Sequence, residues 1–408
     1  MSHRGLLESL FREAVNAVDG RPCVRRALEF APLSGDLSLL AMGKAADGMV
    51  RGAMDLLGPQ IKDGLVITRR GSLSAILAQD ERLRCLQSSH PIPDAASLEA
   101  GKALLDFLDE LPTGRPLLAL VSGGASSLVE WLPDGFGESH LRELNEWLLS
   151  RHMDIAAVNA VRRSVSLVKG GRLALRLRGR PVRLLLISDV PGDDPGVIGS
   201  GMLTAAPAPR PLPDGVPDWV RLAAASIPDA PGPGDPVFAS ISGEIVASNA
   251  RAREAVVDAA SRRDLRVLNH RELLRGDALA AGEMVARTLI DGPPSLHVWG
   301  GETTVSLPPE PGRGGRAQAL ALAAAMVLEG QERVWLLAAG TDGLDGPGED
   351  AGAVVDTQTV FRGRQAGLAP DDCLEAADSG TFLDASGDLL RTGPTGTNVM
   401  DIVIGLKE

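Results

Sequence analysis

The sequence predicts an α/β protein built on a mostly parallel sheet. Short apolar runs recur along the chain, each ending in glycine or a turn, and helical patterns lie between them. The runs lack polar alternation, as expected for parallel strands that are buried on both faces. The alternation of strand and helix over the whole length is typical of layered α/β domains.

The predicted elements follow in chain order. Six apolar runs are predicted to be strands: 37–43 (LSLLAMG), 64–69 (GLVITR), 116–124 (PLLALVSGG), 182–190 (VRLLLISDV), 295–301 (SLHVWGG) and 333–340 (RVWLLAAG). Four segments repeat apolar residues at helical spacing and are predicted to be helices: 96–111, 153–171, 249–263 and 316–330. Residues 206–236 hold nine of the 28 prolines and are interpreted as a domain linker, with an excursion inside one domain as the alternative.

Length and composition exclude several classes of protein. The 408 residues suffice for about two or three domains with a large core. A net charge of −12 argues against a nucleic-acid partner, which needs a basic surface. No run reaches about 18 apolar residues, and the acid-bearing start is unlike a signal peptide, so we expect a cytoplasmic protein with no membrane partner. Cys23, Cys85 and Cys373 are too far apart in sequence to predict a disulfide framework or a metal knuckle.

Polar and glycine residues cluster where the predicted strands end, which is where ligands bind in an open parallel sheet. The residues at these ends are Gly43, Lys44, Ser122, Gly123, Gly124, Ser126, Asp189, Asp193, Glu302 and Asp342. Arg316 lies where a glycine-rich segment meets a predicted helix. Glycines leave N–H groups open to phosphate oxygens, while Lys and Arg neutralise a moving phosphoryl group. Carboxylates can hold Mg²⁺ or another divalent cation.

The usual nucleotide signatures are absent from the sequence. There is no Walker-type P-loop, no G-x-G-x-x-G after a strand, and no G-x-S-x-G nucleophile elbow. The acidic segment 340–352 (GTDGLDGPGEDAG) does not match an EF-hand, because its acids do not fall on alternate ligand positions. Asp342 is interpreted either as a carboxylate facing a Mg²⁺–nucleotide complex or the basic cluster, or as a cap. Asp345, Glu349 and Asp350 are expected to be solvated.

Eight segments carry a resemblance to known proteins: AMGKAADGM, VSGGASSL, NAVRRSVSLVKGGRLA, LLISDVPGDD, WGGETTVSL, GRGGRAQALALA, AAGTDGLDGPGEDAGAVVD and GDLLRTGPTGTNVMDIVI. In this order they resemble the bacterial and archaeal glycerate 2-kinase family with a MOFRL domain, whose members are often misnamed hydroxypyruvate reductase. The resemblance spans about residues 5–406. It implies ATP-dependent phosphorylation of D-glycerate at its 2-hydroxyl, giving 2-phosphoglycerate and ADP, with Mg²⁺ or another divalent cation.

The resemblance also implies a domain organisation. It places an αβα sandwich domain in residues 1–235 and a smaller α/β domain in residues 236–408, with a cleft between them. The MOFRL region would occupy about residues 295–402, and the last strand is expected to pack back on the N-terminal domain. A homo-oligomer is compatible with this organisation.

Roles for individual residues follow from the resemblance. Lys44 and Arg316 match the family's key basic positions, and Asp189 matches an acidic position suited to metal or hydroxyl chemistry, so these three are expected to be catalytic. Substrate or nucleotide binding is expected of Gly43, Ser122, Gly123, Gly124, Ser126, Glu302 and Asp342. Asp189 and Asp193 are expected to hold the metal. The segment 391–398 (RTGPTGTN) stays open between structural support and phosphate contact.

The chain departs from the family pattern in three places. GGRAQA replaces GGRNQE, VRRSVS replaces VRKHLS, and PGVIGSGMLTAAP stands where a Ser, Gly, Pro, Thr run is expected. These changes bear on substrate identity more than on phosphoryl transfer. Two alternatives to a kinase are an NAD(P)H-dependent hydroxypyruvate reductase, which lacks its dinucleotide fingerprint, and a catalytically lapsed nucleotide-binding module, which is disfavoured because Lys44 and Arg316 are retained.

Overall fold

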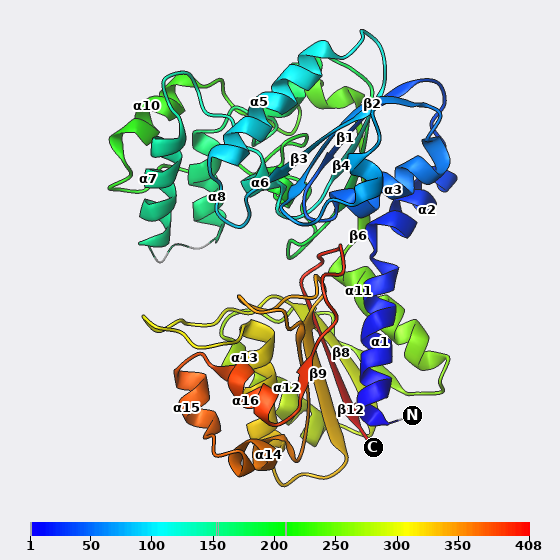
Figure 1. Cartoon of the computed structure of the whole chain (residues 1–408), viewed down its shortest axis with the longest axis vertical. Coiled ribbons are helices and arrows are strands. Elements are labelled where there is room, and N and C mark those ends of the chain that lie inside the picture. The colour runs from blue at the N-terminus through cyan, green and yellow to red at the C-terminus, as the bar shows by residue number, and fades with distance from the viewer. Residues whose placement is uncertain (1, 152, 154, 209) are drawn as a thin grey trace. The chain divides into compact units, whose positions relative to one another are not determined.

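The chain folds into two compact units, each built around its own six-stranded sheet (Figure 1). The computed structural model describes residues 2–151, 153, 155–208 and 210–408. The sheet A unit comprises Gly20–Val246, and the sheet B unit comprises Met1–Asp19 together with Ala247–Glu408. The predicted α/β class is confirmed. Among the described residues, no helix is both long enough and apolar enough to span a bilayer.

Sheet A has the strand order β3-β2-β1-β4-β5-β6. Its strands are β1 (Leu37–Met42), β2 (Ile61–Arg69), β3 (Leu83–Ser88), β4 (Leu117–Val121), β5 (Val182–Ile187) and β6 (Ile241–Ala247). The ladders that join β3, β2, β1, β4 and β5 are all parallel, which confirms four of the predicted strands. Strands β3 and β6 were not predicted, because each lies at an edge of the sheet and leaves part of its length exposed.

Helices cover both faces of sheet A. They are α2 (Gly20–Phe30), α3 (Ala46–Leu57), α4 (Ala75–Ala78), α5 (Ala95–Glu110), α6 (Ala125–Leu128), α7 (Glu138–Leu149), α8 (Ile155–Ser164), α9 (Arg172–Leu177) and α10 (Asp218–Ser226), with short 3₁₀ turns at Ile198–Ser200 and Pro236–Ser240. Leu40 and Met42 of β1 pack in one core cluster with Leu104 of α5. Every residue of β1 is buried, which explains why its sequence shows no polar alternation.

Two predictions for this unit are wrong. The proline-rich segment 206–236 is no linker, because it lies inside the sheet A unit and contains α10. Val216 and Trp219 bury their side chains in a cluster with residues of α7 and α8, which fixes the segment to the domain. The chain passes between the units after Asp19 and after Val246 instead.

The second wrong prediction is a single helix over 153–171. The structure has α8 at Ile155–Ser164, a non-helical stretch, and then α9; residue 154 lies outside the described residues. Gly170 and Gly171 adopt φ angles of 65° and 82°, a left-handed conformation that interrupts helical periodicity.

Sheet B has the order β11-β10-β9-β12-β8-β7 and is mostly antiparallel. Its strands are β7 (Val267–Asn269), β8 (Ser295–Gly301), β9 (Val334–Gly340), β10 (Gly352–Asp356), β11 (Leu389–Leu390) and β12 (Asp401–Lys407). The predicted strands β8 and β9 are confirmed, but they are not neighbours. Strand β12 inserts between them and runs antiparallel to both.

The helices of the sheet B unit lie on both sides of its sheet (Figure 1). They are α1 (His3–Ala17), α11 (Asn249–Ser261), α12 (Ala278–Asp291), α13 (Arg316–Leu328), α14 (Thr359–Gln365), α15 (Pro370–Glu375) and α16 (Ser379–Ala385). Helices α12 and α13 pack closely: a Cβ added to Gly282 would lie 2.3 Å from the carbonyl oxygen of Leu320. The many alanines of α13 permit this close packing, because small side chains let the two helix backbones approach.

Helix α1 belongs to the sheet B unit, although the sequence placed residues 1–235 together. Its buried residues Leu7, Leu10, Phe11 and Ala14 form one face that packs against α11 and β9. At its end, the Thr397 hydroxyl donates a hydrogen bond of 2.7 Å to the carbonyl of Val18. The apolar face of α1 therefore explains why this helix packs in the sheet B unit, although it precedes the sheet A unit in the sequence.

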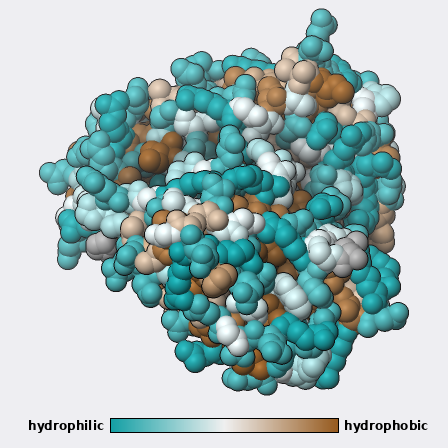
Figure 2. Space-filling view, turned by 60° about the horizontal axis from the view of Figure 1, so that its bottom comes forward, coloured by the Kyte–Doolittle hydropathy of each residue, from teal (hydrophilic) through white to brown (hydrophobic). Residues whose placement is uncertain are grey.

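The face of the protein shown in Figure 2 is mainly hydrophilic, in keeping with the burial of its apolar side chains. Hydrophobic residues form small scattered groups among hydrophilic ones on this face. The apolar side chains are instead concentrated in the core clusters around the two sheets.

A pair of histidines in the sheet B unit, of which His297 is buried and His270 half-buried, generates a prediction about pH. The Ser295 hydroxyl donates to the Pro293 carbonyl, so it must accept from His297 Nε2, 3.0 Å away. His297 Nδ1 then accepts from His270 Nε2 at 3.0 Å. Burial, with the nearby charges of His270 and Lys407, lowers the pKa of His297 to about 4. His297 is therefore neutral in the folded protein near neutral pH.

Unfolding returns His297 to a pKa of about 6.5, so the unfolded chain binds the proton more tightly between pH 6.5 and 4. The free energy of unfolding should fall as pH falls through this window, by up to about 3 kcal/mol from His297 alone. Urea unfolding followed by tryptophan fluorescence at pH 7 and pH 5 measures this loss. We expect His297→Gln to show a smaller loss than the wild type, and an equal loss would show that His297 is not the group responsible.

Candidate active site

The carboxyl ends of β1, β4 and β5 bring three predicted segments to one edge of sheet A. Gly43 and Lys44 follow β1, Ser122–Gly124 follow β4, and Asp189 follows β5. These strands are adjacent and parallel, so their ends share an edge. The strand order reverses between β1 and β4, since β2 and β3 lie on one side and β5 on the other. Such a switch point is where open α/β sheets bind ligands.

The turns after β1 and β4 interlock. The backbone N–H of Lys44 donates to the Gly123 carbonyl at 2.9 Å, and the Ser122 hydroxyl accepts from the N–H of Ala45 at 3.0 Å. Gly43 has a φ of 128°, and a Cβ there would lie 2.2 Å from Ser122 Oγ. Glycine at position 43 is therefore required by the close approach of the two turns.

Side chains close around the glycines of the second turn. A Cβ on Gly123 would lie 1.8 Å from Asp189 Oδ2, so the carboxylate occupies the space that a side chain would need. A Cβ on Gly124 would lie 3.1 Å from Lys44 Cγ and 3.0 Å from His90 Cδ2. A cation, a carboxylate and an imidazole thus surround one short stretch of backbone, a combination suited to binding and deprotonating a polar substrate.

His90 is a member of this group that the sequence did not single out. It follows β3, whose neighbour in the sheet is β2. The rule that functional residues follow strands would have found it, but β3 was not predicted as a strand because its sequence is half polar.

Ser126 and Asp193, two further predicted residues, differ in their contacts. Ser126 Oγ lies 2.7 Å from Ser200 Oγ, which ties the start of α6 to the turn at Ile198–Ser200. Asp193 has a φ of 54° in the turn after β5, and within the described part of the chain its side chain makes no hydrogen bond or ion pair. No three His, Cys, Asp or Glu side chains in the described ranges are arranged to hold a metal ion.

A second group of predicted residues gathers at one edge of sheet B. Because β8 and β9 both run antiparallel to β12, their carboxyl ends lie beside its start, where Asp401 pairs with Gly301 and with Gly340. Glu302 and Asp342 follow β8 and β9 at this edge. Asp401 was not predicted, because it lies at the start of a strand and the expected sites were at strand ends.

Arg316, the first residue of α13, is held by two carboxylates. Its Nε and Nη2 donate to Asp401 Oδ2 and Oδ1 at 2.7 and 3.1 Å, a forked pair. Its Nη1 lies 2.6 Å from Glu302 Oε1. Burial alone would lower the pKa of Arg316, but Asp401 and Glu302 outweigh it and raise the pKa above its ordinary value. The guanidinium is therefore permanently charged and fixed in orientation, which suits it to stabilise an anion.

Asp345 is buried, not solvated as expected. Its carboxylate accepts from the N–H groups of Ala317 and Gln318, at 3.0 and 2.8 Å, and so caps α13 from a distant loop. Burial and the neighbouring Asp401 raise its pKa to about 6. Asp350 is also buried, in ion pairs with Arg313 and Arg391, whereas Glu349 is exposed as expected.

The remaining acid of this loop, Asp342, has a structural contact as well. Its Oδ1 accepts from the N–H of Leu344 at 3.2 Å, and its carbonyl accepts from the N–H of Thr395. The Thr395 hydroxyl donates to the Thr341 carbonyl at 2.6 Å. Segment 391–398 therefore supports the acidic loop structurally, through Thr395.

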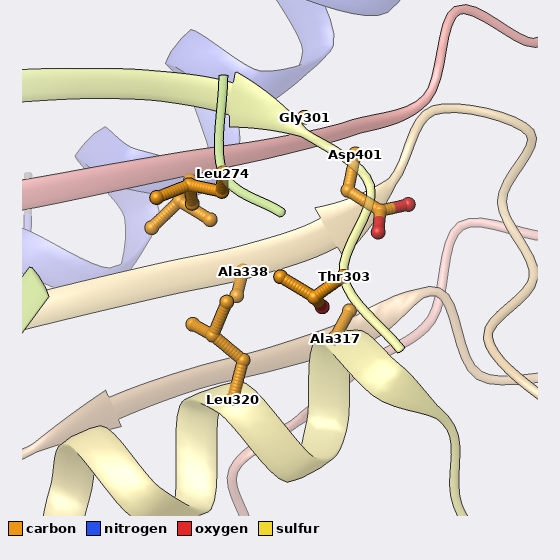
Figure 3. Close-up of a pocket in the computed structure, with 8 residues that line it drawn as sticks. Leu274, Gly301, Thr303, Ala317, Leu320, Ala338 and Asp401 are labelled. Carbon is orange, nitrogen blue, oxygen red and sulfur yellow. The ribbon is translucent and has the colours of Figure 1, made fainter. Parts of the chain in front are cut away.

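A small cavity of about 10 Å³ lies beside Asp401, which pairs with Arg316 (Figure 3). It is lined by Leu274, Gly301, Thr303, Ala317, Leu320, Ala338, Asp401 and Val403. Figure 3 shows the Thr303 side chain between β8 and the start of α13, beside Ala317. The Thr303 hydroxyl is buried and has no hydrogen-bond partner among the described residues. Ala317 and Ala319, two of the departures from the family pattern, are buried in the core cluster of this unit.

Comparison with known proteins gives concordant matches. The model of the DUF4147 family, a domain of unknown function, matches residues 6–210, and that of the MOFRL family matches residues 295–401. A D-glycerate 2-kinase from Thermotoga maritima is 35% identical over 90% of this chain and 90% of its own length. A putative hydroxypyruvate reductase from Agrobacterium vitis is 35% identical over 98% of this chain and 94% of its own. The crystal structure of a Thermotoga maritima glycerate kinase has a TM-score of 0.88 at 30% identity, covering 99% of both chains.

The unpaired Thr303 hydroxyl predicts an unusual substitution. Thr303→Val keeps the shape of the side chain and removes a buried group that lacks a partner, so the melting temperature should stay unchanged or rise. Thr341→Val is the matched control, because the Thr341 hydroxyl donates to Met400 and accepts from Val399. Its loss should cost about 1–3 kcal/mol of unfolding free energy. Equal destabilisation by both substitutions, measured by thermal melting, would show that the Thr303 hydroxyl is hydrogen-bonded in solution.

Proposed function

Because the chain belongs to the glycerate 2-kinase family with DUF4147 and MOFRL domains, we propose that it transfers the γ-phosphoryl group of ATP to the 2-hydroxyl of D-glycerate. The products are 2-phosphoglycerate and ADP. The observation that carries the proposal is the convergence of Lys44, Asp189 and the turn Gly123–Gly124 at the topological switch of sheet A.

Each residue of the sheet A group has a role that its chemistry suits. The Lys44 ammonium neutralises charge on the phosphoryl group as it moves. The Asp189 carboxylate accepts the proton of the attacking hydroxyl, and the N–H groups of the turn 122–124 bind phosphate oxygens, with Gly43 and Ser126 holding that turn in shape. His90 lies against Gly124, where it orients a polar substrate.

In the sheet B unit, Arg316 is the group that we assign to phosphoryl charge. Three of its five N–H donors are used by Asp401 and Glu302, so two remain for an oxyanion. Glu302 positions the guanidinium, and Asp342 shapes the loop beside it through its turn with Leu344.

A divalent cation belongs to the proposal, with Asp189 and Asp193 as its protein ligands. Mg²⁺ is usually held by one or two carboxylates together with the phosphates of the substrate. A site of this kind needs no cluster of three protein ligands, and the described ranges contain none. When bound, the ion neutralises phosphate charge. The residues retain their own tasks of binding and proton transfer.

A reductase fits this chain poorly. The turn after β1 reads Gly43-Lys44-Ala45-Ala46, without the glycine fingerprint that admits a dinucleotide pyrophosphate. A coupled assay of ADP formation with ATP, Mg²⁺ and a panel of hydroxy acids tests the proposal directly. D-Glycerate should be the preferred acceptor, and the absence of ADP formation with every acid would refute a kinase.

The metal and the cofactor can be tested on the same preparation. Adding excess EDTA should abolish ADP formation, because chelation removes the cation that neutralises the phosphate charge. Restoring Mg²⁺ should restore activity. NADH or NADPH with hydroxypyruvate should show no oxidation at 340 nm, so steady oxidation by pure enzyme would favour the reductase.

Substitution of the two basic residues tests their roles. Lys44→Met and Arg316→Ala should each lower kcat by roughly 10²-fold or more, by analogy with lost electrostatic donors, while nucleotide affinity changes far less. Arg316→Lys should not rescue activity, because an ammonium cannot reproduce the fork to Asp401.

Thermal melting separates catalysis from folding in these variants. Arg316→Ala leaves Asp401 without its partner and should also lose stability, whereas Arg316→Lys keeps a charge beside it. If Lys44→Met and Arg316→Lys both retain more than about half of the wild-type kcat, the assigned site is wrong.

A further inference from the structure

The guanidinium of Arg162, in the sheet A unit, forms no ion pair with the residues that the structure describes, and its Nε is buried without a hydrogen bond. Resting on the proposed function, we propose that Arg162 of α8 binds the carboxylate of the acceptor acid and so selects 2-hydroxy acids over neutral alcohols. Arg162 lies in the segment NAVRRSVSLVKGG, to which the proposed function gives no task.

The surroundings of Arg162 contain more positive than negative charge. Lys169 and Glu130, which are 0% and 2% exposed, form a buried ion pair. The second oxygen of Glu130 accepts from the N–H of Trp131 at 3.0 Å, so this carboxylate is already engaged on both oxygens. Arg162 interacts electrostatically with Glu130 as well. Two cations therefore share one carboxylate, and an uncompensated charge in a partly buried place is costly.

The side chain of Arg162 is itself unpaired among the described residues. Its Nε is buried and has no hydrogen-bond partner, and no ion pair to it occurs in this part of the chain. Desolvation by burial lowers its pKa despite the attraction of Glu130. An anion arriving from solvent would supply both the missing acceptor and the missing charge, and a carboxylate fits the guanidinium fork with two hydrogen bonds.

Arg172, from the same motif, shows what a purely structural arginine looks like here. It donates to the carbonyls of Pro228 and Arg163, at 2.7 and 2.9 Å, and makes longer bonds to those of Ser166 and Lys169. Its donors thus hold backbone in place. The donors of Arg162 have no comparable partners among the described residues.

The position of Arg162 suits a ligand at the glycine turn. Helix α6 begins directly after Gly124 and has four residues, and Glu130 follows it by two. The four helical residues rise about 6 Å and the next two residues, of which Val129 is extended, add at most about 7 Å, so Glu130 lies within roughly 13 Å of Gly124. The N–H of Leu167, beyond α8, donates to the Trp131 carbonyl at 2.9 Å and fixes the two segments together.

The neighbouring Arg163 serves as the matched control. It has the same charge, and consecutive residues of a helix point in different directions. The charged groups that act on Arg163 are Arg210 and Asp194. Arg163 therefore does not share its carboxylate neighbour with Lys169, as Arg162 does. Substitution of Arg163 should therefore leave acceptor binding nearly unchanged.

Steady-state kinetics of Arg162→Gln, Arg162→Lys and Arg163→Gln test the inference. For Arg162→Gln, the KM for D-glycerate should rise about 10- to 100-fold, the range for a lost hydrogen bond to a charged group, while the KM for ATP changes less than about threefold. Arg162→Lys should fall between this variant and the wild type. Glyceramide, in which a neutral amide replaces the carboxylate, should be a poor acceptor for the wild type, and Arg162→Gln should discriminate against it far less.

Calorimetric titration of D-glycerate without ATP gives a readout independent of turnover, with thermal melting as the check on folding. If Arg162→Gln fails to fold, Arg162→Lys must still show the raised KM. An unchanged KM for D-glycerate, a rise in the KM for ATP instead (a phosphate-binding arginine), or an effect in Arg163→Gln alone would each overturn the inference while leaving the kinase intact. A wild type that phosphorylates no acid would instead refute the proposed function itself.

Discussion

The candidate site depends on the close approach of two strand-end turns in sheet A. Gly43 and Gly123 leave no room for a Cβ, the first because Ser122 lies against it and the second because the Asp189 carboxylate does. Parallel neighbours β1, β4 and β5 bring these turns to one edge. Without the glycines, the carboxylate, the lysine and the backbone N–H groups could no longer share one small volume. Backbone packing thus sets the chemistry that the site can perform.

Sheet B reaches a comparable result by a different topology. Strand β12 separates β8 from β9 and runs antiparallel to both, so its first residue, Asp401, lies beside their carboxyl ends. Arg316 then meets Asp401 and Glu302 at the start of α13, whose N–H groups are capped by Asp345. Two carboxylates of the acidic loop also have structural roles: Asp345 caps the start of α13, and Asp350 forms ion pairs with Arg313 and Arg391.

Sequence reasoning found the residues that immediately follow long apolar strands, because such strands are evident from composition and their ends share an edge by topology. Lys44, Asp189 and the turn after β4 were predicted in this way. His90 and Asp401 were missed, since β3 is half polar and Asp401 begins its strand. The burial of Asp345, the unit of α1 and the place of segment 206–236 depend on tertiary packing of residues far apart in sequence, which local patterns do not encode.

The central claim is that the Asp189 carboxylate, seated on Gly123, accepts a proton during phosphoryl transfer. A single-turnover measurement of 2-phosphoglycerate formation by Asp189→Asn tests it most directly, because asparagine preserves the shape of the side chain beside Gly123 and removes its negative charge and its basicity. We expect a rate lowered by about 10²-fold or more, the usual range for a lost general base, with an unchanged melting temperature. Transfer at the wild-type rate by a stably folded Asp189→Asn variant would contradict the claim.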